Sequence, residues 1–369
     1  MRKEKKTLVY VTMECFADTD VTVLGHLTKE YNVVWYYIYE SRKANRLSRQ
    51  EIQDYASTYG IDVHLLDPLA RRRSLRYCVF YFMIAEDINR YAPDVVCYAI
   101  RDPYWMIAVK MKLKCKNVVL GIHDVLPHST RFSLSDFLDR KTRNLSIWCH
   151  RNFLTYSSNQ HELLKSVFKK DSYMVGMSCK YMGDSSLSPD NIESSVRLLF
   201  FGAIQVYKGL DLLISAMETL RQKGVSNLSL TIAGRGDYWS QCEALIKTKE
   251  MFNLNIRFVE TSEVPDLMCS HHFLVLPYRD ATQSGPLATA VAYELPIIAP
   301  NFGCFAETLS KESAVLYEQG TLEGALQRVA RMSTQEYSSL KKACHKVKEA
   351  NSEESIADNY IKAFNEIIR

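Results

Sequence analysis

The sequence has no hydrophobic stretch long enough to cross a bilayer, which takes about 18–20 apolar residues. Its longest apolar run is 77–85. The basic start, residues 1–6, leads into 7–13, which is too short for the apolar core of a signal peptide and predicts a first strand. We therefore expect a cytoplasmic protein, either soluble or peripheral on the inner face of the membrane.

The ten cysteines form no Cys-x-x-Cys pair, so the sequence predicts neither a zinc ribbon nor a thioredoxin motif. Most of them lie in apolar runs, where cysteine behaves as a small hydrophobe. No disulfide framework is indicated, and a reducing compartment is expected. His123 and His128 lack a metal-ligand spacing and have no acidic cluster beside them, so we expect no metal.

A strongly basic segment is also missing. The formal net charge of +4 is mild, and we expect no binding to nucleic acid. One local cluster, Arg71–Arg73 with Arg76, precedes the apolar run 77–84. Two interpretations stay open for it: docking on an anionic membrane or a lipid-linked acceptor, and a solvated arginine cluster before a core helix.

What the sequence does contain is a repeated alternation of short β-rich and longer amphipathic runs. The first half predicts strands at 7–13, 33–39, 61–66, 95–100, 118–123 and 153–157, with helices at 21–30, 48–59, 75–91, 104–113, 134–149 and 160–168. The second half predicts strands at 197–201, 228–233, 255–259, 273–277, 297–299 and 314–317, with helices at 209–223, 238–249, 264–269, 286–293, 322–332, 334–347 and 353–368.

This alternation is typical of parallel, doubly wound sheets covered by helices on both faces. We predict an α/β protein with two tandem Rossmann-like domains that face a cleft. The domains are 1–182 and 196–350, joined by a linker at 183–195 that is rich in Gly, Ser, Asp and Pro. The last helix, 351–369, is expected to pack back toward the N-terminal domain.

Ligands of such sheets bind at the carboxyl ends of the strands. In the second half, Lys208 follows Gly202 at the start of a helix, where a cation meets an anion already favoured by the helix dipole. Gly234 and Gly236 follow the next strand. Taken alone, the first loop is better explained as a surface lysine beside a turn glycine, and the second is equally well explained as a tight turn.

Two more loops belong to the same edge. Ser284 is placed to cap a helix whose first turn contains Pro286, which leaves free amides near Gly285 for a diphosphate. Gly303 again follows a strand, with Glu307 one turn later. Four such loops at one sheet edge favour a nucleotide-type site over four unrelated turns. In the first half, His123 follows the fifth strand, where it can hydrogen-bond a hydroxyl group or move a proton, or simply be a turn histidine.

Taken in order, these loops resemble the retaining glycosyltransferases of the GT-B fold, in particular the large fourth family (group 1). The resemblance covers about 197–307. It rests on four motifs: Phe-Gly-x5-Lys-Gly from Phe201, Ile-Ala-Gly-x-Gly from Ile232, Thr-Gln-Ser-Gly from Thr282 and Pro-x-Ile-Ala-x3-Gly-x3-Glu from Pro296. In the first half, His123-Asp124 with Pro127-His128 is similar to a motif of some members.

The resemblance implies roles for individual residues. Lys208 would contact the donor diphosphate and act in catalysis together with His123, and no cofactor would be bound permanently. Asp18, Asp20 and Asp124 would lie on the acceptor side. The donor contacts would be Gly202, Gln205, Lys208, Gly234, Val259, Thr282, Gln283, Ser284, Gly285 and Thr289.

The sequence departs from the family pattern at two places. Many members have an arginine shortly before the lysine, and here Gln205 is the nearest substitute. Many also have two glutamates eight positions apart, and here these positions hold Ala281 and Thr289. The departure points to an altered donor or to an inactive relative.

The expected activity is metal-independent transfer of a sugar from a UDP- or GDP-linked donor to a hydroxyl group of a glycan or lipid-linked acceptor. Retention of anomeric configuration is expected, and a role in cell-surface polysaccharide or O-antigen assembly is what the family implies. Two rivals remain: another enzyme on the same fold, such as a nucleotide-sugar epimerase or a phosphorylase, and a non-catalytic carbohydrate-binding relative.

Overall fold

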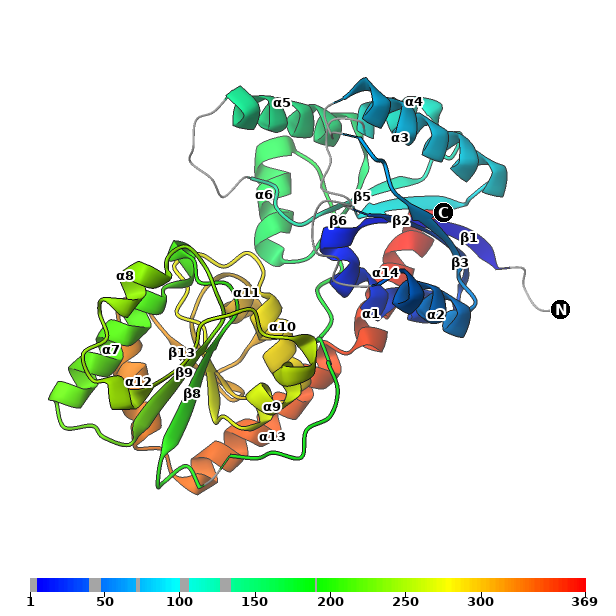
Figure 1. Ribbon diagram of the computed structural model, residues 1–369. Helices are drawn as coiled ribbons and strands as arrows, with labels where there is room; N and C mark the ends of the chain where they lie inside the picture. Colours follow the sequence, from blue (N-terminus) through cyan, green and yellow to red (C-terminus); the bar gives the residue numbers. More distant parts are fainter. Residues whose placement is uncertain (1–4, 40–47, 71–73, 100–105, 127–133, 190) are drawn as a thin grey trace. The chain divides into compact units, whose positions relative to one another are not determined.

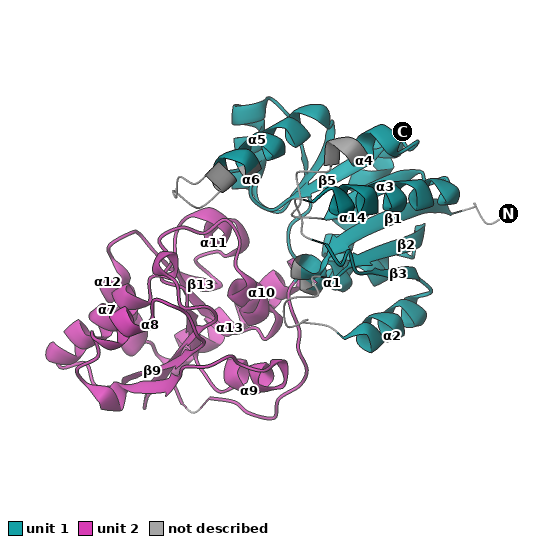
Figure 2. Cartoon of the chain, turned by 45° about the horizontal axis from the view of Figure 1, so that its top comes forward, with its two compact units in different colours: residues 1–178, 353–369 teal, residues 179–352 magenta. Residues whose placement is uncertain are grey.

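The computed structural model describes residues 5–39, 48–70, 74–99, 106–126, 134–189 and 191–369 (Figure 1). The side chains at 15, 18, 106–108, 134–136 and 139 also lie outside the described part. The chain divides into two compact units, Met1–Ser178 with Glu353–Arg369, and Cys179–Ser352 (Figure 2). The segment proposed as a linker, 183–195, lies in the second unit, and the last helix lies in the first.

The first unit is built on a seven-stranded parallel sheet in the order β3-β2-β1-β4-β5-β6-β7. The strands are β1 (Lys6–Met13), β2 (Tyr31–Ile38), β3 (Asp62–Leu66), β4 (Val95–Ala99), β5 (Val118–Ile122), β6 (Asn152–Thr155) and β7 (Tyr173–Met174). Successive side chains of β1 enter opposite cores: Leu8 and Tyr10 lie in one, Val9 and Val11 in the other. Both faces of the sheet are thus buried, as in other parallel sheets.

Helices cover the two faces of this sheet. The helices are α1 (Ala17–Leu27), α2 (Arg49–Tyr59), α3 (Leu75–Ile88), α4 (Met106–Lys112), α5 (Leu134–Cys149), α6 (Ser158–Phe168) and α14 (Glu353–Ile368), with short 3-10 turns η1 (Glu14–Phe16) and η2 (Asn89–Tyr91). One face is covered by α1, α2 and α14, the other by α3 to α6. Figure 1 shows α14 beside α1, although the two lie at opposite ends of the chain.

The second unit contains a six-stranded parallel sheet in the order β10-β9-β8-β11-β12-β13. Its strands are β8 (Val196–Phe201), β9 (Leu228–Ala233), β10 (Phe252–Asn255), β11 (Phe273–Val275), β12 (Ile297–Pro300) and β13 (Ala314–Tyr317). Its helices are α7 (Leu210–Gln222), α8 (Trp239–Glu243), α9 (Val264–Cys269), α10 (Gly285–Ala292), α11 (Gly303–Thr308), α12 (Leu322–Ala330) and α13 (Thr334–Ala350), with 3-10 turns η3 (Val206–Lys208), η4 (Lys249–Met251) and η5 (Thr261–Glu263). The predicted pair of doubly wound parallel sheets is confirmed.

Three predicted elements are wrong in their extent, and the first is the helix expected over 21–30, which is instead α1 (Ala17–Leu27). The helix expected over 238–249 ends at Glu243, because Glu218 of α7 accepts the backbone N–H groups of Lys247 (2.7 Å) and Thr248 (2.8 Å) and holds the chain out of the helix. The strand expected over 255–259 is instead β10, which ends at Asn255. The short elements β7 and α11 had not been predicted.

Candidate functional site

Four loops follow strands of the second sheet at its carboxyl edge, and backbone hydrogen bonds join them. The amide of Gly202 donates to Ala233 O (2.9 Å), and that of Ile204 donates to Arg235 O (2.9 Å). The amide of Arg279 donates to Tyr207 O (2.7 Å). A further bond, from Cys304 N to Ala281 O (3.1 Å), attaches the fourth loop. The loops that the sequence singled out therefore form one connected surface.

Glycines make this close approach possible. A Cβ atom at Gly209 would lie 1.9 Å from Pro277 O, and one at Gly234 would lie 1.9 Å from Gly202 O. Both residues also have positive φ angles, +67° and +151°, which side-chain-bearing residues rarely adopt. At these two positions the glycine is required by the contact between loops, whether or not a ligand is present.

Lys208 lies at the centre of this surface, with its side chain only 6% exposed. Its Nζ atom lies 5.4 Å from the centroid of the Tyr278 ring. Within the described part of the chain, no carboxylate forms an ion pair with it, and burial alone lowers the pKa of Lys208 to about 8. A buried ammonium group without an anion is costly, so this arrangement favours an anionic ligand at Nζ.

The loop that carries Lys208 is held by a residue the sequence had not singled out. Arg279 forms a two-pronged ion pair with Asp211, with Nη1–Oδ1 and Nη2–Oδ2 distances of 2.8 and 2.6 Å. Its Nη1 also donates to Val206 O (2.7 Å). The guanidinium therefore ties the β11–α10 loop to η3 and to the first turn of α7. No local sequence pattern identifies this pair, because its two residues lie 68 positions apart in the sequence.

The first turn of α10 lies beside Lys208. A Cβ atom at Gly202 would lie 3.4 Å from Lys208 Nζ and 3.2 Å from Pro286 Cγ, so the ammonium group and the helix start border the same small space. Ser284 caps the helix by accepting Leu287 N (3.2 Å), and Pro286 has no N–H group. The amide of Gly285 is the first-turn donor that these contacts leave for a ligand.

The remaining predicted donor residues differ in their exposure. Gln205 is exposed, whereas Thr282 and Gln283, in the loop after β11, and Val259, after β10, are half-buried. Thr289 is buried, and its hydroxyl donates to Gly285 O (3.1 Å) within α10. Direct donor contacts of these residues stay predictions.

In the first unit, His123 directly follows β5 and lies between two aromatic rings. Its ring stacks on Phe16 at a centroid distance of 4.1 Å and on Tyr156 at 4.0 Å, with interplanar angles of 2° and 11°. The loop after it is held by Gln160, whose Oε1 accepts Val125 N (2.6 Å). The two stacked rings restrict the imidazole to one orientation, and the hydrogen bond from Val125 holds the loop that follows. A histidine at a loose surface turn would not be fixed in this way.

The three predicted acceptor-side aspartates lie in different environments. Asp124 is exposed, whereas Asp20 is fully buried and accepts hydrogen bonds from Tyr10 Oη and Thr12 Oγ1, both at 3.0 Å. The side chain of Asp18 lies outside the described residues, as do His128 and residues 71–73. The contacts of Asp20 are those of a structural residue that joins α1 to β1, and an acceptor contact there stays a prediction.

The described residues contain neither a cluster of metal ligands nor a membrane-spanning helix. No group of three or more His, Cys, Asp or Glu side chains is arranged to hold a metal ion, and the predicted metal independence stays a prediction. In the same part of the chain, no helix is both long and apolar enough to cross a bilayer.

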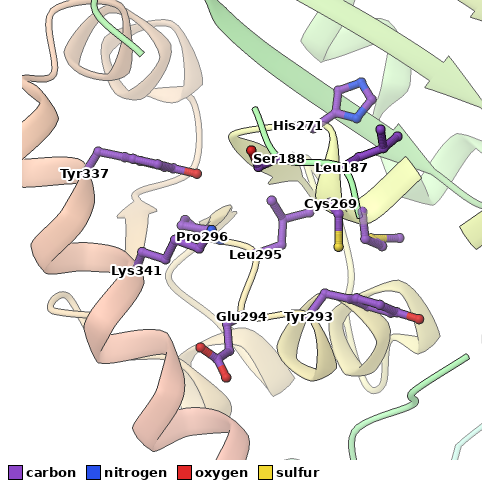
Figure 3. A pocket seen from close by; sticks show the side chains of 11 residues that line it. Leu187, Ser188, Cys269, His271, Tyr293, Glu294, Leu295, Pro296, Tyr337 and Lys341 are labelled. Carbon is purple, nitrogen blue, oxygen red and sulfur yellow. The ribbon is translucent and has the colours of Figure 1, made fainter. Parts of the chain in front are cut away.

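A small hollow of about 60 Å³ lies elsewhere in the second unit (Figure 3). Its walls include Cys269 and His271, which precede β11, and Pro296, which precedes β12. It is therefore at the amino edge of the sheet, opposite the four loops. His271 is already hydrogen-bonded to Leu267 O and Thr231 Oγ1, both at 2.7 Å. A space of this size holds only a few water molecules, and it is not the ligand site.

Comparison with known proteins gives matches to sugar-transferring enzymes. Residues 195–335 match the family model "Glycosyl transferases group 1", which covers the four loops. A GDP-mannose:glycolipid 4-beta-D-mannosyltransferase of Xanthomonas campestris pv. campestris is 25% identical over 262 residues, which are 68% of this chain and 70% of the relative.

Solved structures show the same fold. A glycosyltransferase from Rickettsia africae matches with a TM-score of 0.72 at 15% identity and full coverage of both chains. Anabaena Alr3699/HepE, in complex with UDP and glucose, matches with a TM-score of 0.67 at 11% identity, over 98% of this chain and 99% of that one. The two tandem Rossmann-like units are those of the GT-B fold.

Proposed function

We propose that this chain, a group 1 glycosyltransferase of the GT-B fold, transfers a sugar from a nucleotide-diphosphate donor to a hydroxyl group of a glycan or lipid-linked acceptor. The observation that carries the proposal is Lys208. Its buried ammonium group has no ion-paired carboxylate in the described chain and lies beside the first turn of α10. Two phosphate groups would supply the missing negative charge.

The proposed chemistry follows from where charge develops. When the bond between the sugar and the diphosphate breaks, negative charge grows on the leaving phosphate oxygen. An ammonium group and an amide already aimed at that position stabilise this charge without having to reorganise. Lys208 and the amide of Gly285 would fill these roles. In the predicted mechanism the leaving phosphate takes the acceptor proton, and His123 hydrogen-bonds a hydroxyl of the reacting sugar.

For the donor we propose a GDP- or UDP-linked hexose, with GDP-mannose as the first candidate. The Xanthomonas relatives are named for GDP-mannose, and Anabaena Alr3699/HepE holds UDP. The nucleobase would lie near Gly234 and Val259. There Arg235 packs over the Phe258 ring at 5.3 Å and provides a flat, partly charged surface.

The stereochemical course is a separate proposal. Retention is the expectation from the family resemblance, whereas the Xanthomonas relatives are named for a β-mannosyl product. Because a β product from an α-linked donor requires inversion, the anomeric configuration of the product decides the question. We propose to determine it from the one-bond carbon–proton coupling at the new anomeric centre. An α product from an α donor would establish retention, and a β product would refute it.

The acceptor we propose is a glycolipid or a lipid-linked glycan used in cell-surface polysaccharide or O-antigen assembly. The word glycolipid in the names of the Xanthomonas relatives supports this class. An epimerase on the same fold would return the nucleotide still joined to the altered sugar and would need no acceptor. Nucleotide release that depends on added acceptor would therefore exclude the epimerase alternative.

The first experiment is thermal stabilisation by GDP, UDP, ADP and their sugar conjugates, with and without a divalent cation. A ligand that binds only the folded protein raises its Tm by mass action. A shift with one nucleotide that is lost in Lys208→Ala and kept in Lys249→Ala, an exposed lysine of the same unit, would support the site. If no nucleotide shifts the Tm, a non-catalytic relative is favoured instead. The observation behind that alternative is that Ala281 and Thr289 stand where many members of the family have glutamates.

A further inference from the structure

A set of exposed apolar side chains covers three neighbouring helices of the first unit. Of 21 large hydrophobic residues exposed in the described chain, eight lie on α3, α4 and α5. Trp148 and Met111 are the most prominent of those on α4 and α5, 72% and 82% exposed. Single exposed hydrophobics are common on protein surfaces, but a cluster of large ones marks an interaction surface.

The exposed residues follow helical spacing. On α3 they are Leu75, Val79 and Met83, one turn apart along a single stripe. On α5 they are Phe137, Leu138, Leu145 and Trp148. The opposite sides of the same helices are buried: Tyr81 and Ile84 of α3 and Ile147 of α5 belong to the core above the sheet. Both helices are therefore apolar on two sides, of which one faces solvent.

The three helices form one continuous layer. Asn89, at the end of α3, donates to Lys112 O (3.0 Å) and accepts Lys114 N (2.8 Å), which joins α3 to α4. Lys110 of α4 donates to Cys149 O at the end of α5. Figures 1 and 2 both show α3, α4 and α5 on the same side of the first sheet. We call the outer surface of these three helices the α3–α5 face.

The end of this face around Trp148 is rimmed by positive charge. Residues 140–151, from α5 to the start of the next strand, include Arg140, Lys141, Arg143 and Arg151 and no acid, whereas the acids of α5, Asp136 and Asp139, lie in its first two turns. Arg151 and Lys170, together with Lys110 of α4, line an open hollow beside Trp148 of about 690 Å³. Lys141 extends from the exposed side of α5, with Nζ 5.4 Å from the centroid of the Phe137 ring.

Part of this charge has a structural role. Lys170 donates to Trp148 O (3.3 Å) and His150 O (3.1 Å), and with Lys110 it caps the carboxyl end of α5. Helix capping accounts for these two lysines. It does not account for an exposed tryptophan and methionine between them, nor for the exposed charges of Lys141 and Arg151.

We propose that the α3–α5 face docks on an anionic phospholipid bilayer. Tryptophan, methionine and leucine would enter the headgroup boundary, and the surrounding Lys and Arg side chains would contact lipid phosphates. Charge complementarity is what selects a lipid surface over an apolar protein partner. The docking goes beyond the proposed transfer reaction and does not depend on it, because none of these residues belongs to the donor site.

The test is sedimentation of the full chain with vesicles of phosphatidylglycerol and phosphatidylcholine in equal amounts, and with vesicles of phosphatidylcholine alone. We expect binding to the anionic vesicles that weakens with added salt. Leu145→Ser with Trp148→Ser should reduce the partition coefficient more than tenfold. Lys141→Glu with Arg151→Glu should reduce it by at least about fivefold for each residue. The controls are Leu187→Ser and the pair Lys249→Glu with Lys311→Glu, exposed residues of the second unit.

A second measurement uses Trp148 itself and does not depend on the folding of a double variant. Its fluorescence, taken as the difference between the native chain and Trp148→Phe, should shift to the blue and be quenched by brominated lipid. Three outcomes would overturn the proposal: no binding to anionic vesicles, binding unchanged in both α3–α5 double variants, or a concentration-dependent dimer that Trp148→Ser abolishes. The last would assign the face to a second copy of the chain. Donor binding by the same variants reports separately on the proposed function.

Discussion

Arg279, in the loop between β11 and α10, and Asp211, in the first turn of α7, meet in a two-pronged ion pair with N–O distances of 2.8 and 2.6 Å. This pair can influence donor binding even if neither residue contacts the donor. The same guanidinium holds Val206 O, two residues before Lys208. The pair therefore fixes the position of the ammonium group on which the proposed donor site rests.

Breaking this pair should weaken donor binding without removing any donor contact. Arg279→Ala and Asp211→Ala should each lower the free energy of unfolding by about 1–3 kcal/mol, as expected for a charged hydrogen-bonded pair. Each should also raise the donor Kd, because Lys208 loses its support. Arg221→Ala, which breaks an exposed pair with Glu250 (3.8 Å), is the control and should leave the Kd unchanged. Additive effects in the Arg279–Asp211 double variant would contradict a shared role.

Replacing Lys208 by methionine should have opposite effects on stability and on binding. The buried ammonium group costs free energy in the unliganded protein. Lys208→Met should therefore leave the free energy of unfolding unchanged or raise it by up to about 1–4 kcal/mol, with a corresponding rise in Tm. The same change should weaken donor binding by ~100-fold or more, since an interaction with a charged phosphate is lost. Calorimetry and donor titration measure the two quantities on one sample. A large loss of stability would show that Lys208 is a structural residue.

Donor binding should depend on pH in a direction set by Lys208. Burial lowers its pKa to about 8 in the free protein, and a bound diphosphate would raise it again. Below pH 8 the ammonium group is already charged, so the Kd should be constant. Above pH 8 binding requires uptake of a proton, and affinity should fall about tenfold per pH unit. The donor Kd measured from pH 6.5 to 9.5 tests this, and Lys208→Met should remove the dependence.

The same pKa shift predicts the pH dependence of stability. Because the folded-state pKa of Lys208 is below its ordinary value, the unfolded chain binds the proton more tightly between about pH 8 and the usual lysine pKa. The contribution of this residue to the free energy of unfolding therefore rises with pH across that window. The difference between native chain and Lys208→Met, followed by urea denaturation, should show this rise, and a difference that falls with pH would contradict it.

Local sequence patterns were sufficient for most strands of both sheets and for the four loops. Apolar strands followed by Gly and then by amphipathic runs identify β8, β9 and β12 with the loops after them, because both signals are local. Contacts between distant residues were not accessible in this way. The end of α8 depends on Glu218, which lies on α7 and binds Lys247 N (2.7 Å). No pattern within 238–249 indicates that contact.

In the candidate site, too, local signals were predictable from the sequence and contacts between distant residues were not. Lys208 could be predicted from its loop, but the pair Arg279–Asp211 could not, because it joins segments 68 residues apart. His123 was identified from its place after a strand, whereas the stacking with Phe16 and Tyr156 needs three separate elements to come together. The burial of Asp20 likewise depends on Tyr10 and Thr12 of β1, which turn its carboxylate inward.

Stacking on two rings makes a specific prediction for His123. If its imidazole hydrogen-bonds the reacting sugar, His123→Ala should lower kcat by about 100-fold or more while the donor nucleotide Kd stays unchanged. Phe16→Leu removes one stacking ring but keeps the imidazole, so kcat should fall less and stability should change little. Kinetics with a saturating donor and binding of the nucleotide alone separate the two effects. Equal loss in both variants would mean that the histidine only packs against its neighbours.

Replacement by alanine should have different effects on stability at two glycines of the second unit. A Cβ atom at Gly209 would lie 1.9 Å from Pro277 O, at a φ of +67°, so Gly209→Ala must move one loop off another. We expect a loss of roughly 3 kcal/mol in unfolding free energy. A Cβ atom at Gly285 has nothing within 4 Å in the unliganded protein, and Gly285→Ala should not lower stability. If the donor phosphate approaches the amide of Gly285, however, the added methyl group should obstruct it and raise the donor Kd. A Gly285→Ala chain with native Tm and native Kd would place the phosphate elsewhere, even if Lys208 is required for binding.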